Sequence, residues 1–319
     1  MARPLVTTII PVYNRAGMLR EAVASVLAQT YRPIEVLIVD DGSTDETRET
    51  AEELAASDPA IRLVRQSNSG PGAAREAARL QAEGAFIQHL DSDDLLLPQK
   101  FELQVAALER DASAGAAYGW TRRRFPDGSV HPAPWKRSGE RIETMFPAML
   151  MSRWWDTATP LYRRTVIDRA GAWLPLWAEE DWEYDCRIAA AGTRLAYVAD
   201  WVCEYRAHSA GHLSGRGGDP RILRDRAEAH ERIYAHARAA GIDPSSVEMQ
   251  HFARELFLLA RQCGAAGLAD ASMRLFRLAR EASGEAGRRL QFRLYEAVAN
   301  SIGWTAAGRI ACITDRLRW

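Results

Sequence analysis

The sequence has few cysteines, no long apolar run and almost no net charge. Its four cysteines are spread over 319 residues without CxxC or other zinc-type spacing, which disfavours a disulfide framework and is typical of reduced thiols in a cytosolic protein. No uninterrupted apolar stretch approaches the roughly 18 residues of a membrane-spanning helix. Lys and Arg number 41 and Asp and Glu 42, so no overall basic field points to nucleic acid as a partner. We expect a soluble, cytoplasmic protein with a local binding site.

Residues 5–110 alternate between short β-branched runs and helix-forming segments. The runs LVTTIIPVY, IEVLIVDD, IRLVRQ and AFIQHLD are each followed by a segment with helical periodicity. This βαβ repetition predicts an α/β fold, with a mostly parallel sheet covered by helices on both faces. Ligands of such sheets bind outside the carboxyl ends of the strands. The residues at those ends are Tyr13, Asn14, Asp40, Asp41, Asn68, Gly70, Asp91 and Asp93.

The rest of the chain divides into a mixed region and a helical one. The mixed region predicts a hairpin about FPDGSV, a helix near 140–151, strands in TATPLYRR and RLAYVADW, and a helix in EEDWEYDCRIAAAG. Breaks near GIDPSS, CGAAG and SGEAG predict four helices in the remaining sequence. We therefore expect one domain over 1–215, with halves 1–110 and 111–215, and a helical region over 216–319.

The last predicted helix carries an apolar stripe surrounded by arginines. The stripe comprises Leu290, Leu294, Val298, Ile302 and Ile310. The arginines are Arg288, Arg289, Arg293, Arg309, Arg316 and Arg318. Such a stripe usually packs on the rest of the protein, and this is the interpretation we favour. The alternative is a helix that lies on a membrane surface.

Three aspartates crowd the end of the fourth predicted strand, in AFIQHLDSDDLLLP. Asp91 and Asp93 are two residues apart and therefore share a face at an extended strand end, while Asp94 points elsewhere or caps the next helix. Oxygen ligands suit Mg²⁺ or Mn²⁺ better than zinc. Acidic residues before a helix are often ordinary caps, but this position at a strand end favours a cation site.

Two further segments have a structural and a functional interpretation. In IVDDGSTDET, Ser43 or Thr44 is expected to cap the following helix, whereas Asp41 is not needed for a cap. SGPGAAREAA superficially resembles the dinucleotide-binding fingerprint, but Arg75 stands where Gly or Ala is required, and the segment follows the third strand rather than the first. A dehydrogenase is therefore disfavoured.

Five segments, in chain order, resemble the family 2 glycosyltransferases with the GT-A fold. They are TTIIPVYN, EVLIVDDGSTDET, NSGPGAAR, FIQHLDSDD and WAEEDWEYDCRI. The resemblance covers about residues 4–215 and leaves the helical region outside it. It implies a GT-A sheet flanked by helices, a nucleotide-sugar donor, most simply a UDP-sugar, and a divalent metal, Mn²⁺ or Mg²⁺.

The resemblance also implies a nucleotide-binding set. Tyr13 would flank the base, Asp41 would bond to it, and Arg75 would lie near the base and the diphosphate. Pro11 and Ser92 belong to the same set because they lie in the matching motifs.

The remaining implied roles concern the diphosphate and the reaction. Asp91 would contact the ribose or a metal-bound water. Asp93 would ligate the metal, and His208 would reach the metal or the diphosphate, although a lone loop histidine is more often structural. Asp181 matches the general base of an inverting transfer, with Glu180 as its rival.

Departures from the family pattern shape the expected reaction. Glu76 and Ala78 replace the usual Asn and Gly after the arginine of the third motif, and the Gln-x-x-Arg-Trp motif of processive synthases is not present. We therefore expect one sugar to be moved to a hydroxyl of a saccharide or lipid-linked acceptor, as in cell-surface polysaccharide biosynthesis. Two alternatives stay open, a nucleotide-sugar binding module without turnover and a nucleotidyltransferase of similar architecture. Nothing in the sequence specifies the sugar, the acceptor or the oligomeric state.

Overall fold

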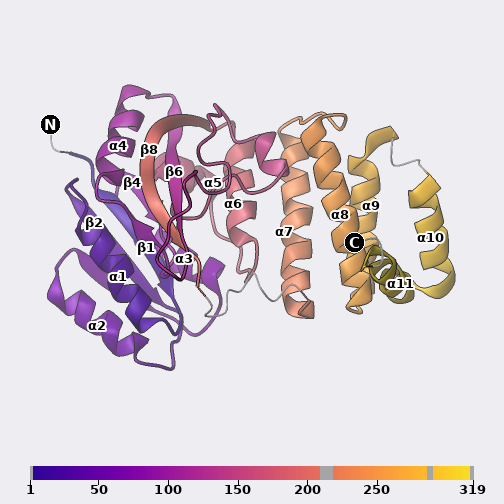
Figure 1. The fold of residues 1–319 in the computed structure, drawn as a ribbon, viewed down its shortest axis with the longest axis horizontal. Helices are drawn as coiled ribbons and strands as arrows, with labels where there is room; N and C mark the ends of the chain where they lie inside the picture. Colours follow the sequence, from indigo (N-terminus) through magenta and orange to yellow (C-terminus); the bar gives the residue numbers. More distant parts are fainter. Residues whose placement is uncertain (1–2, 209–217, 286–289, 317–319) are drawn as a thin grey trace. The chain divides into compact units, whose positions relative to one another are not determined.

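The computed structural model describes residues 3–208, 218–285 and 290–316 (Figure 1). The chain groups into two compact units. The sheet unit comprises residues 1–145, 154–176 and 191–210, and the helical unit comprises residues 146–153, 177–190 and 211–319. The domain boundary expected near residue 215 stays a prediction. Two segments that precede it in the chain, 146–153 and 177–190, belong to the helical unit.

The sheet unit contains one eight-stranded sheet within the described residues, with the order β3-β2-β1-β4-β7-β6-β8-β5. Its strands are β1 (Val6–Val12), β2 (Ile34–Asp40), β3 (Ile61–Arg65), β4 (Phe86–His89), β5 (Leu95–Leu96), β6 (Ala114–Arg124), β7 (Leu161–Arg163) and β8 (Arg194–Arg206). Strands β3, β2, β1 and β4 are parallel, β7 is antiparallel to both of its neighbours, and β6 pairs with β8 in parallel. The expected α/β fold with a mostly parallel sheet is confirmed.

Helices cover both faces of the first strands of this sheet, which have no exposed face. Every residue of β1 and β2 is buried, as parallel strands between two helical layers require. The helices are α1 (Ala16–Leu27), α2 (Thr47–Ser57), α3 (Pro71–Arg79), α4 (Lys100–Arg110) and α5 (Arg164–Ala170). Helix α3 starts with Pro71 after Gly70, whose φ of 89° favours glycine.

The register aligns the strand ends that carry the candidate site. Val12 of β1 pairs with Asp40 of β2, and Asp40 pairs with Arg65 of β3. Because these strands are parallel, the residues that follow them emerge at one edge of the sheet. The loops after β1, β2, β3 and β4 therefore lie together.

The helical unit consists of the 3₁₀ turn η1 (Ala148–Leu150), α6 (Glu180–Ala190), α7 (Pro220–Ala239), α8 (Val247–Ala265), α9 (Ala269–Ala282), α10 (Leu290–Ile302) and α11 (Trp304–Arg316). Five helices follow residue 219 in the described residues, so the expectation of four is wrong. Gly303, with a φ of 87°, ends α10 and separates it from α11. None of the helices described is long and apolar enough to cross a bilayer.

The apolar stripe near the C-terminus does not pack on the protein. Leu290 is 66% exposed and Leu294 is 56% exposed, and Val298, Ile302 and Ile310 are also exposed. The buried face of α10 is instead formed by Phe292 and Ala299. The expectation that the stripe packs on the protein is therefore wrong. Helix α10 has apolar residues on two faces, and the face that carries Phe292 and Ala299 is the buried one.

Two expectations for the mixed region change in the structure. The helix near 140–151 is reduced to η1, because the backbone upstream of it bonds elsewhere: the Glu140 carbonyl accepts from the Tyr118 hydroxyl at 2.8 Å, and the Leu195 N–H donates to the Glu143 carbonyl at 2.9 Å. The hairpin about FPDGSV is present as a single antiparallel bridge between Arg124 and Val130.

Candidate functional site

Asp41, directly after β2, fixes the loop that leads into α3. Its Oδ1 accepts from Gln66 Nε2 at 2.7 Å and from the Ser69 N–H at 2.8 Å, and its Oδ2 accepts from the Gly70 N–H at 2.9 Å. The residue is 4% exposed. A carboxylate has about four acceptor positions, so Asp41 keeps capacity for a further donor while it shapes the loop.

The end of β1 is joined to the loop after β2 by Asn14. Its backbone N–H donates to Ser43 Oγ at 3.1 Å, and its side-chain Oδ1 accepts from the Thr44 N–H at 2.8 Å. Neither hydroxyl caps α2, which has no side-chain cap, so the capping expectation for these residues is wrong. The preceding Tyr13 is 42% exposed and therefore accessible to a ligand.

Arg75 links helix α3 to the aspartate that follows β4. Its guanidinium donates to Asp91 Oδ1 at 2.6 Å and lies 5.0 Å from the ring centroid of Trp173. Arg75 is 2% exposed, whereas the Asp91 side chain is 34% exposed. The buried guanidinium thus fixes the orientation of the more exposed Asp91 carboxylate at this edge of the sheet.

Asp93 lies between two basic side chains. Its Oδ2 is 3.0 Å from His208 Nε2 and is bonded by the guanidinium of Arg15, which is itself 3.3 Å from the same imidazole nitrogen. Burial alone would raise the pKa of Asp93, but the Arg15 charge and the His208 hydrogen bond outweigh it and hold the pKa below its usual value. The carboxylate is therefore ionised at neutral pH.

The two neighbours of Asp93 are buried. Asp94 is 4% exposed and accepts from the Arg206 N–H at 3.1 Å, so it points toward β8 and does not cap α4. Burial, together with Asp93, Asp91 and Asp156, raises the pKa of Asp94 well above its usual range. Ser92 is 5% exposed.

Arg206, the last residue of β8, bonds to the loop that carries Asp93. Its Nε donates to the Asp93 carbonyl at 2.5 Å, and its guanidinium pairs with Glu21. These contacts hold the Asp93 loop at the end of β8.

The donor set at Asp93 fits a divalent metal bound jointly with a diphosphate. No group of three or more His, Cys, Asp or Glu side chains among the described residues could hold a metal without other ligands. The Asp93 oxygen and the His208 nitrogen nevertheless converge on one cationic group, the Arg15 guanidinium. Mg²⁺ is commonly held by one or two protein groups plus substrate phosphates.

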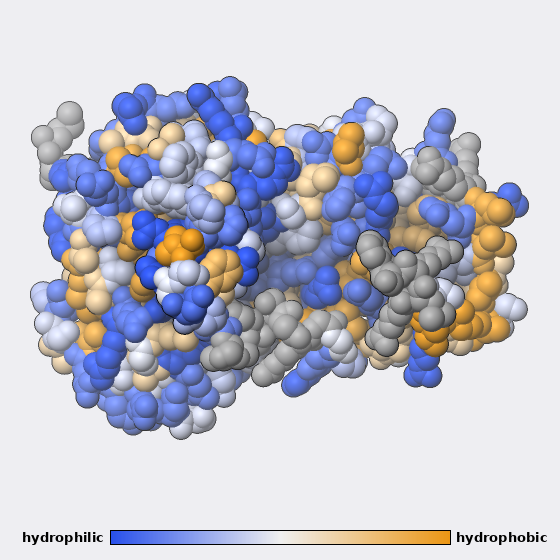
Figure 2. Space-filling model, in the orientation of Figure 1, coloured by the Kyte–Doolittle hydropathy of each residue, from blue (hydrophilic) through white to orange (hydrophobic). Residues whose placement is uncertain are grey.

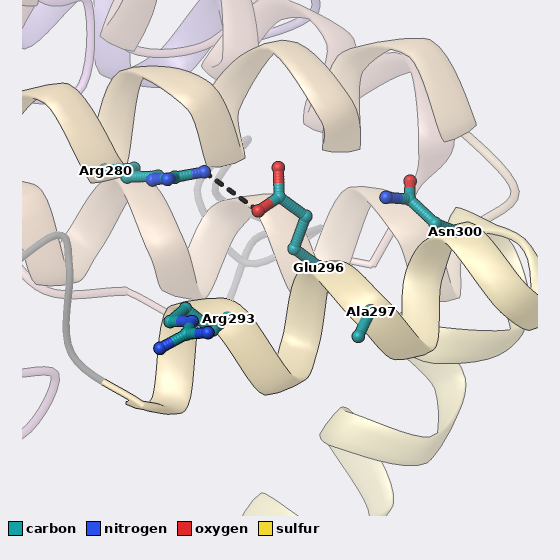
Figure 3. A pocket seen from close by; sticks show the side chains of 5 residues that line it. All are labelled: Arg280, Arg293, Glu296, Ala297 and Asn300. Atoms are coloured by element: carbon teal, nitrogen blue, oxygen red, sulfur yellow. Dashed lines mark hydrogen bonds and ion pairs between the residues drawn. The ribbon is translucent and has the colours of Figure 1, made fainter.

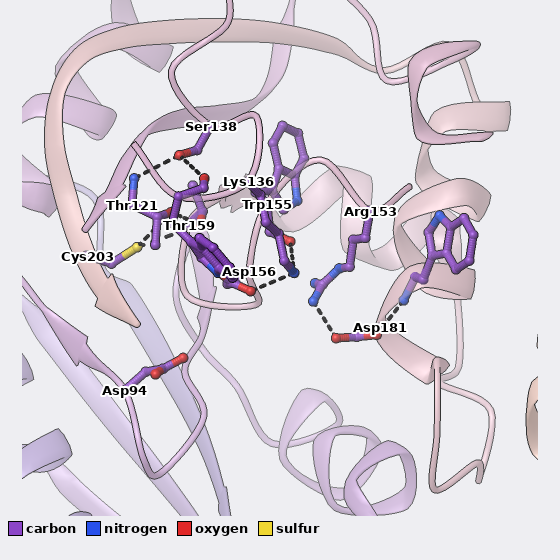
Figure 4. Close-up of polar contacts among 12 residues, drawn as sticks. Asp94, Thr121, Lys136, Ser138, Arg153, Trp155, Asp156, Thr159, Asp181 and Cys203 are labelled. Atoms are coloured by element: carbon purple, nitrogen blue, oxygen red, sulfur yellow. Dashed lines mark hydrogen bonds and ion pairs between the residues drawn. The ribbon is translucent and has the colours of Figure 1, made fainter. Parts of the chain in front are cut away.

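Asp181 lies in the helical unit, in the first turn of α6. Its Oδ2 pairs with Arg153, and its Oδ1 accepts from the Trp182 N–H at 2.7 Å (Figure 4). Its side chain is 25% exposed, whereas Glu180 is 6% exposed. Arg153 also donates to Asp185 at 2.8 Å. Its guanidinium is therefore held by two carboxylates, those of Asp181 and Asp185. Asp181 is the more accessible carboxylate of the two rivals.

Helix α7 holds the segment that carries Asp181. Glu179, which has a positive φ of 60°, lies 2.8 Å from Arg226 Nε and 2.9 Å from His230 Nδ1. Glu183 lies 2.8 Å from His236 Nε2. These contacts fix the backbone two residues before and two residues after Asp181.

Several of these residues were missed in the sequence. Arg15 follows the PVYN segment directly, and that position is the only sequence signal for it. Arg153 lies in LMSRWW, a segment outside the five family motifs. The α7 residues have no motif at all, because their role comes from tertiary contact.

Comparisons with known families and sequences agree on one enzyme class. The family model described as glycosyl transferase family 2 matches residues 7–165. A chondroitin synthase of Pasteurella multocida is 39% identical over 127 residues, which are 40% of this chain and 13% of that protein. The EpsH protein of Bacillus subtilis is 30% identical over 217 residues, 65% of this chain and 62% of EpsH. This chain thus spans under two thirds of each of these relatives.

Solved structures share the fold at low sequence identity. S. aureus TarS, residues 1–349, has a TM-score of 0.69 and 19% identity, with 98% of this chain and 92% of that one covered. The same protein in complex with UDP-GlcNAc has a TM-score of 0.65 and 19% identity, with 89% of each chain covered. A mannosyltransferase of Pyrobaculum calidifontis in complex with GDP-Man and Mn²⁺ has a TM-score of 0.55 and 21% identity, with 99% and 88% covered. The expected GT-A architecture is confirmed.

Proposed function

Because the chain belongs to the family 2 glycosyltransferases, we propose that it moves one sugar from a UDP-sugar to a hydroxyl of a saccharide or lipid-linked acceptor, with inversion at the anomeric carbon. One observation carries this proposal: Asp41, Arg75 and Asp93 lie at the same edge of the sheet. There Asp41 binds the loop before α3, Arg75 pairs with Asp91, and Asp93 contacts His208. UDP is favoured over other nucleotides because TarS, which shares the fold, was solved with UDP-GlcNAc.

The uridine is assigned to the loops after β1 and β2. Pro11 lies near the end of β1, just before Tyr13, whose exposed ring has the area to stack on a base. Asp41 would accept from the base N–H, since its remaining lone pairs can do so while the protein donors keep the carboxylate in place.

The diphosphate is assigned to the loops after β3 and β4. A divalent metal, Mn²⁺ or Mg²⁺, would offset the negative charge that develops on the leaving diphosphate. Asp93 and His208 would hold it, and Asp91 would contact the ribose or a water beside it. Arg75, which holds Asp91, and Ser92 would complete the nucleotide-binding set.

The acceptor hydroxyl is assigned to Asp181. A carboxylate in the first turn of a helix is favoured in its ionised form, which is the form that accepts a proton. Arg153 and the Trp182 N–H fix its orientation through one oxygen each. Attack would come from the face opposite the diphosphate, and the proton would pass from the hydroxyl to the Asp181 carboxylate.

The location follows from the proposed acceptor. The similarity to a chondroitin synthase supports work in the assembly of a cell-surface polysaccharide. We place this step in the cytoplasm, at the inner membrane face when the acceptor is lipid-linked.

The donor test is a nucleotide screen by thermal unfolding, since a ligand stabilises the state it binds. UDP and UDP-sugars with Mn²⁺ should raise the melting temperature more than GDP or dTDP, and the effect should fall with EDTA and in Asp93→Ala. A UDP effect that EDTA and Asp93→Ala leave unchanged would remove the metal role. A stronger effect of GDP would refute the assignment of uracil as the nucleobase of the donor. A donor that binds and is never turned over would indicate a binding module.

A further inference from the structure

Helices α10 and α11 present an unusual amount of apolar surface to solvent. Six of the eleven exposed large apolar side chains in the described residues lie on these two helices. They are Leu290, Leu294, Val298, Ile302, Ile310 and Ile313. The first four are spaced four residues apart and form one ridge along α10. Figure 2 shows apolar residues gathered over α10, at the right of the view. Gathered apolar side chains of this kind mark an interaction surface.

The fold does not need this ridge. The opposite face of α10 fixes the helix, with Phe292 and Tyr295 at 4.9 and 5.2 Å between ring centroids from Phe257 of α8. Helix α11 is fixed by Trp304 against Phe276 of α9, and by a close backbone approach of Gly308 to Ala265. Substitutions on the ridge therefore test binding without removing core contacts.

The charge of this part of the chain identifies the partner. Residues 286–319 contain six arginines against Glu296 and Asp315, whereas the whole chain has a net charge of −1. Arg293 and Arg280 line an open hollow of about 550 Å³ with Glu296, Ala297 and Asn300 (Figure 3). Arg280 pairs with Glu296 at 2.8 Å, and Arg293 has no acidic partner among the described residues. Guanidinium groups of this kind bind phosphate oxygens readily.

We propose that the α10–α11 surface docks the protein on an anionic lipid bilayer. The ridge side chains would enter the boundary between headgroups and acyl chains, and Arg293 and Arg309 would contact lipid phosphates. A second copy of the chain fits less well, because pairing two such surfaces would bring two strongly basic segments together. None of the residues of this surface belongs to the proposed donor or acceptor site. The test of the surface therefore measures membrane binding and does not depend on turnover.

The experiment is vesicle flotation of the full chain, with phosphatidylcholine alone and with about one phosphatidylglycerol in three lipids. The parent protein should float with the anionic vesicles, stay behind with the neutral ones and be released by high salt. Leu294→Ser with Val298→Ser should weaken binding by roughly tenfold or more. Arg293→Ala with Arg309→Ala should weaken it several-fold and reduce its salt dependence.

The matched controls are Leu80→Ser and Val247→Ser, which change side chains that are 70% and 72% exposed elsewhere. Both should float like the parent. Failure of the parent to bind anionic vesicles would overturn the proposal, as would an equal loss in the controls. Sedimentation of the parent as a dimer that only the ridge variants dissociate, without flotation, would assign the ridge to self-association instead.

Discussion

Arg226→Met should loosen the segment that carries Asp181 and destabilise the helical unit. Arg226 and Glu179 are 2.8 Å apart, with side chains 25% and 23% exposed. At an effective dielectric constant of about 20, this separation corresponds to roughly 6 kcal/mol of attraction. Desolvation of both groups offsets most of it, and His230 remains as a partner, so we expect a loss of about 1–3 kcal/mol in the free energy of unfolding.

The control for this substitution is on the same helix. Arg232→Met removes an ion pair with Glu228 at 3.5 Å whose arginine side chain is 56% exposed, and it should cost less than about 0.5 kcal/mol. Urea unfolding followed by circular dichroism measures both variants against the parent. Donor affinity should not change in Arg226→Met, whereas turnover should fall, because Asp181 follows Glu179 by two residues.

The pH dependence gives a second readout of the same pair. Burial alone would raise the pKa of Glu179, but His230 and Arg226 outweigh it and lower the pKa below its usual value of 4.5. A carboxylate with a lowered pKa contributes stability above its usual pKa and loses it as the pH falls through the native value. The deficit of Arg226→Met should therefore be full at pH 7 and shrink in acid below about pH 4. An equal cost of Arg226→Met and Arg232→Met at pH 7, or a deficit that does not shrink in acid, would refute this reasoning.

Two further predictions concern the sheet unit. Arg15→Ala should bind Mn²⁺ several-fold more tightly than the parent in the absence of nucleotide, measured by electron paramagnetic resonance. The Arg15 guanidinium occupies the Asp93 oxygen that we propose as a metal ligand, and weaker binding would contradict this shared position. Burial lowers the pKa of Lys100 to about 7, so the unfolded chain holds more protons than the native one between that value and 10.5. The parent should therefore gain about 2 kcal/mol of unfolding free energy over Lys100→Met between pH 7 and pH 9, and a constant difference would show that Lys100 stays charged in the fold.

The sheet and its site edge could be predicted because their signals are local. Continuous Ile and Val runs followed by helical periods identify buried parallel strands, and polar residues at the ends of those runs must then emerge at one edge. Asp41, Asp91 and Asp93 were placed in this way. Their nucleotide and metal roles stay predictions.

The residues that support the site could not be predicted, because their partners are distant in the sequence. Arg15 is 78 residues from Asp93, and Arg153 is 28 residues from Asp181. No periodicity connects such pairs. The prediction that the C-terminal apolar stripe packs on the protein was wrong for a related reason. A helical period identifies an apolar face, but it does not show which of two apolar faces the fold will cover.

The turnover of Asp181→Asn tests the account most directly. The substitution keeps the size of the side chain and leaves Arg153 paired with Asp185, while it removes the proton acceptor. Sugar transfer, or slow release of UDP from the donor when no acceptor is known, should fall by roughly a hundredfold or more. Donor affinity should stay within about twofold of the parent, since we propose that other residues contact the donor. Glu180→Gln, at the buried neighbour, should be much milder, and parent-like turnover in Asp181→Asn, or a large loss in Glu180→Gln alone, would contradict the assignment of the base.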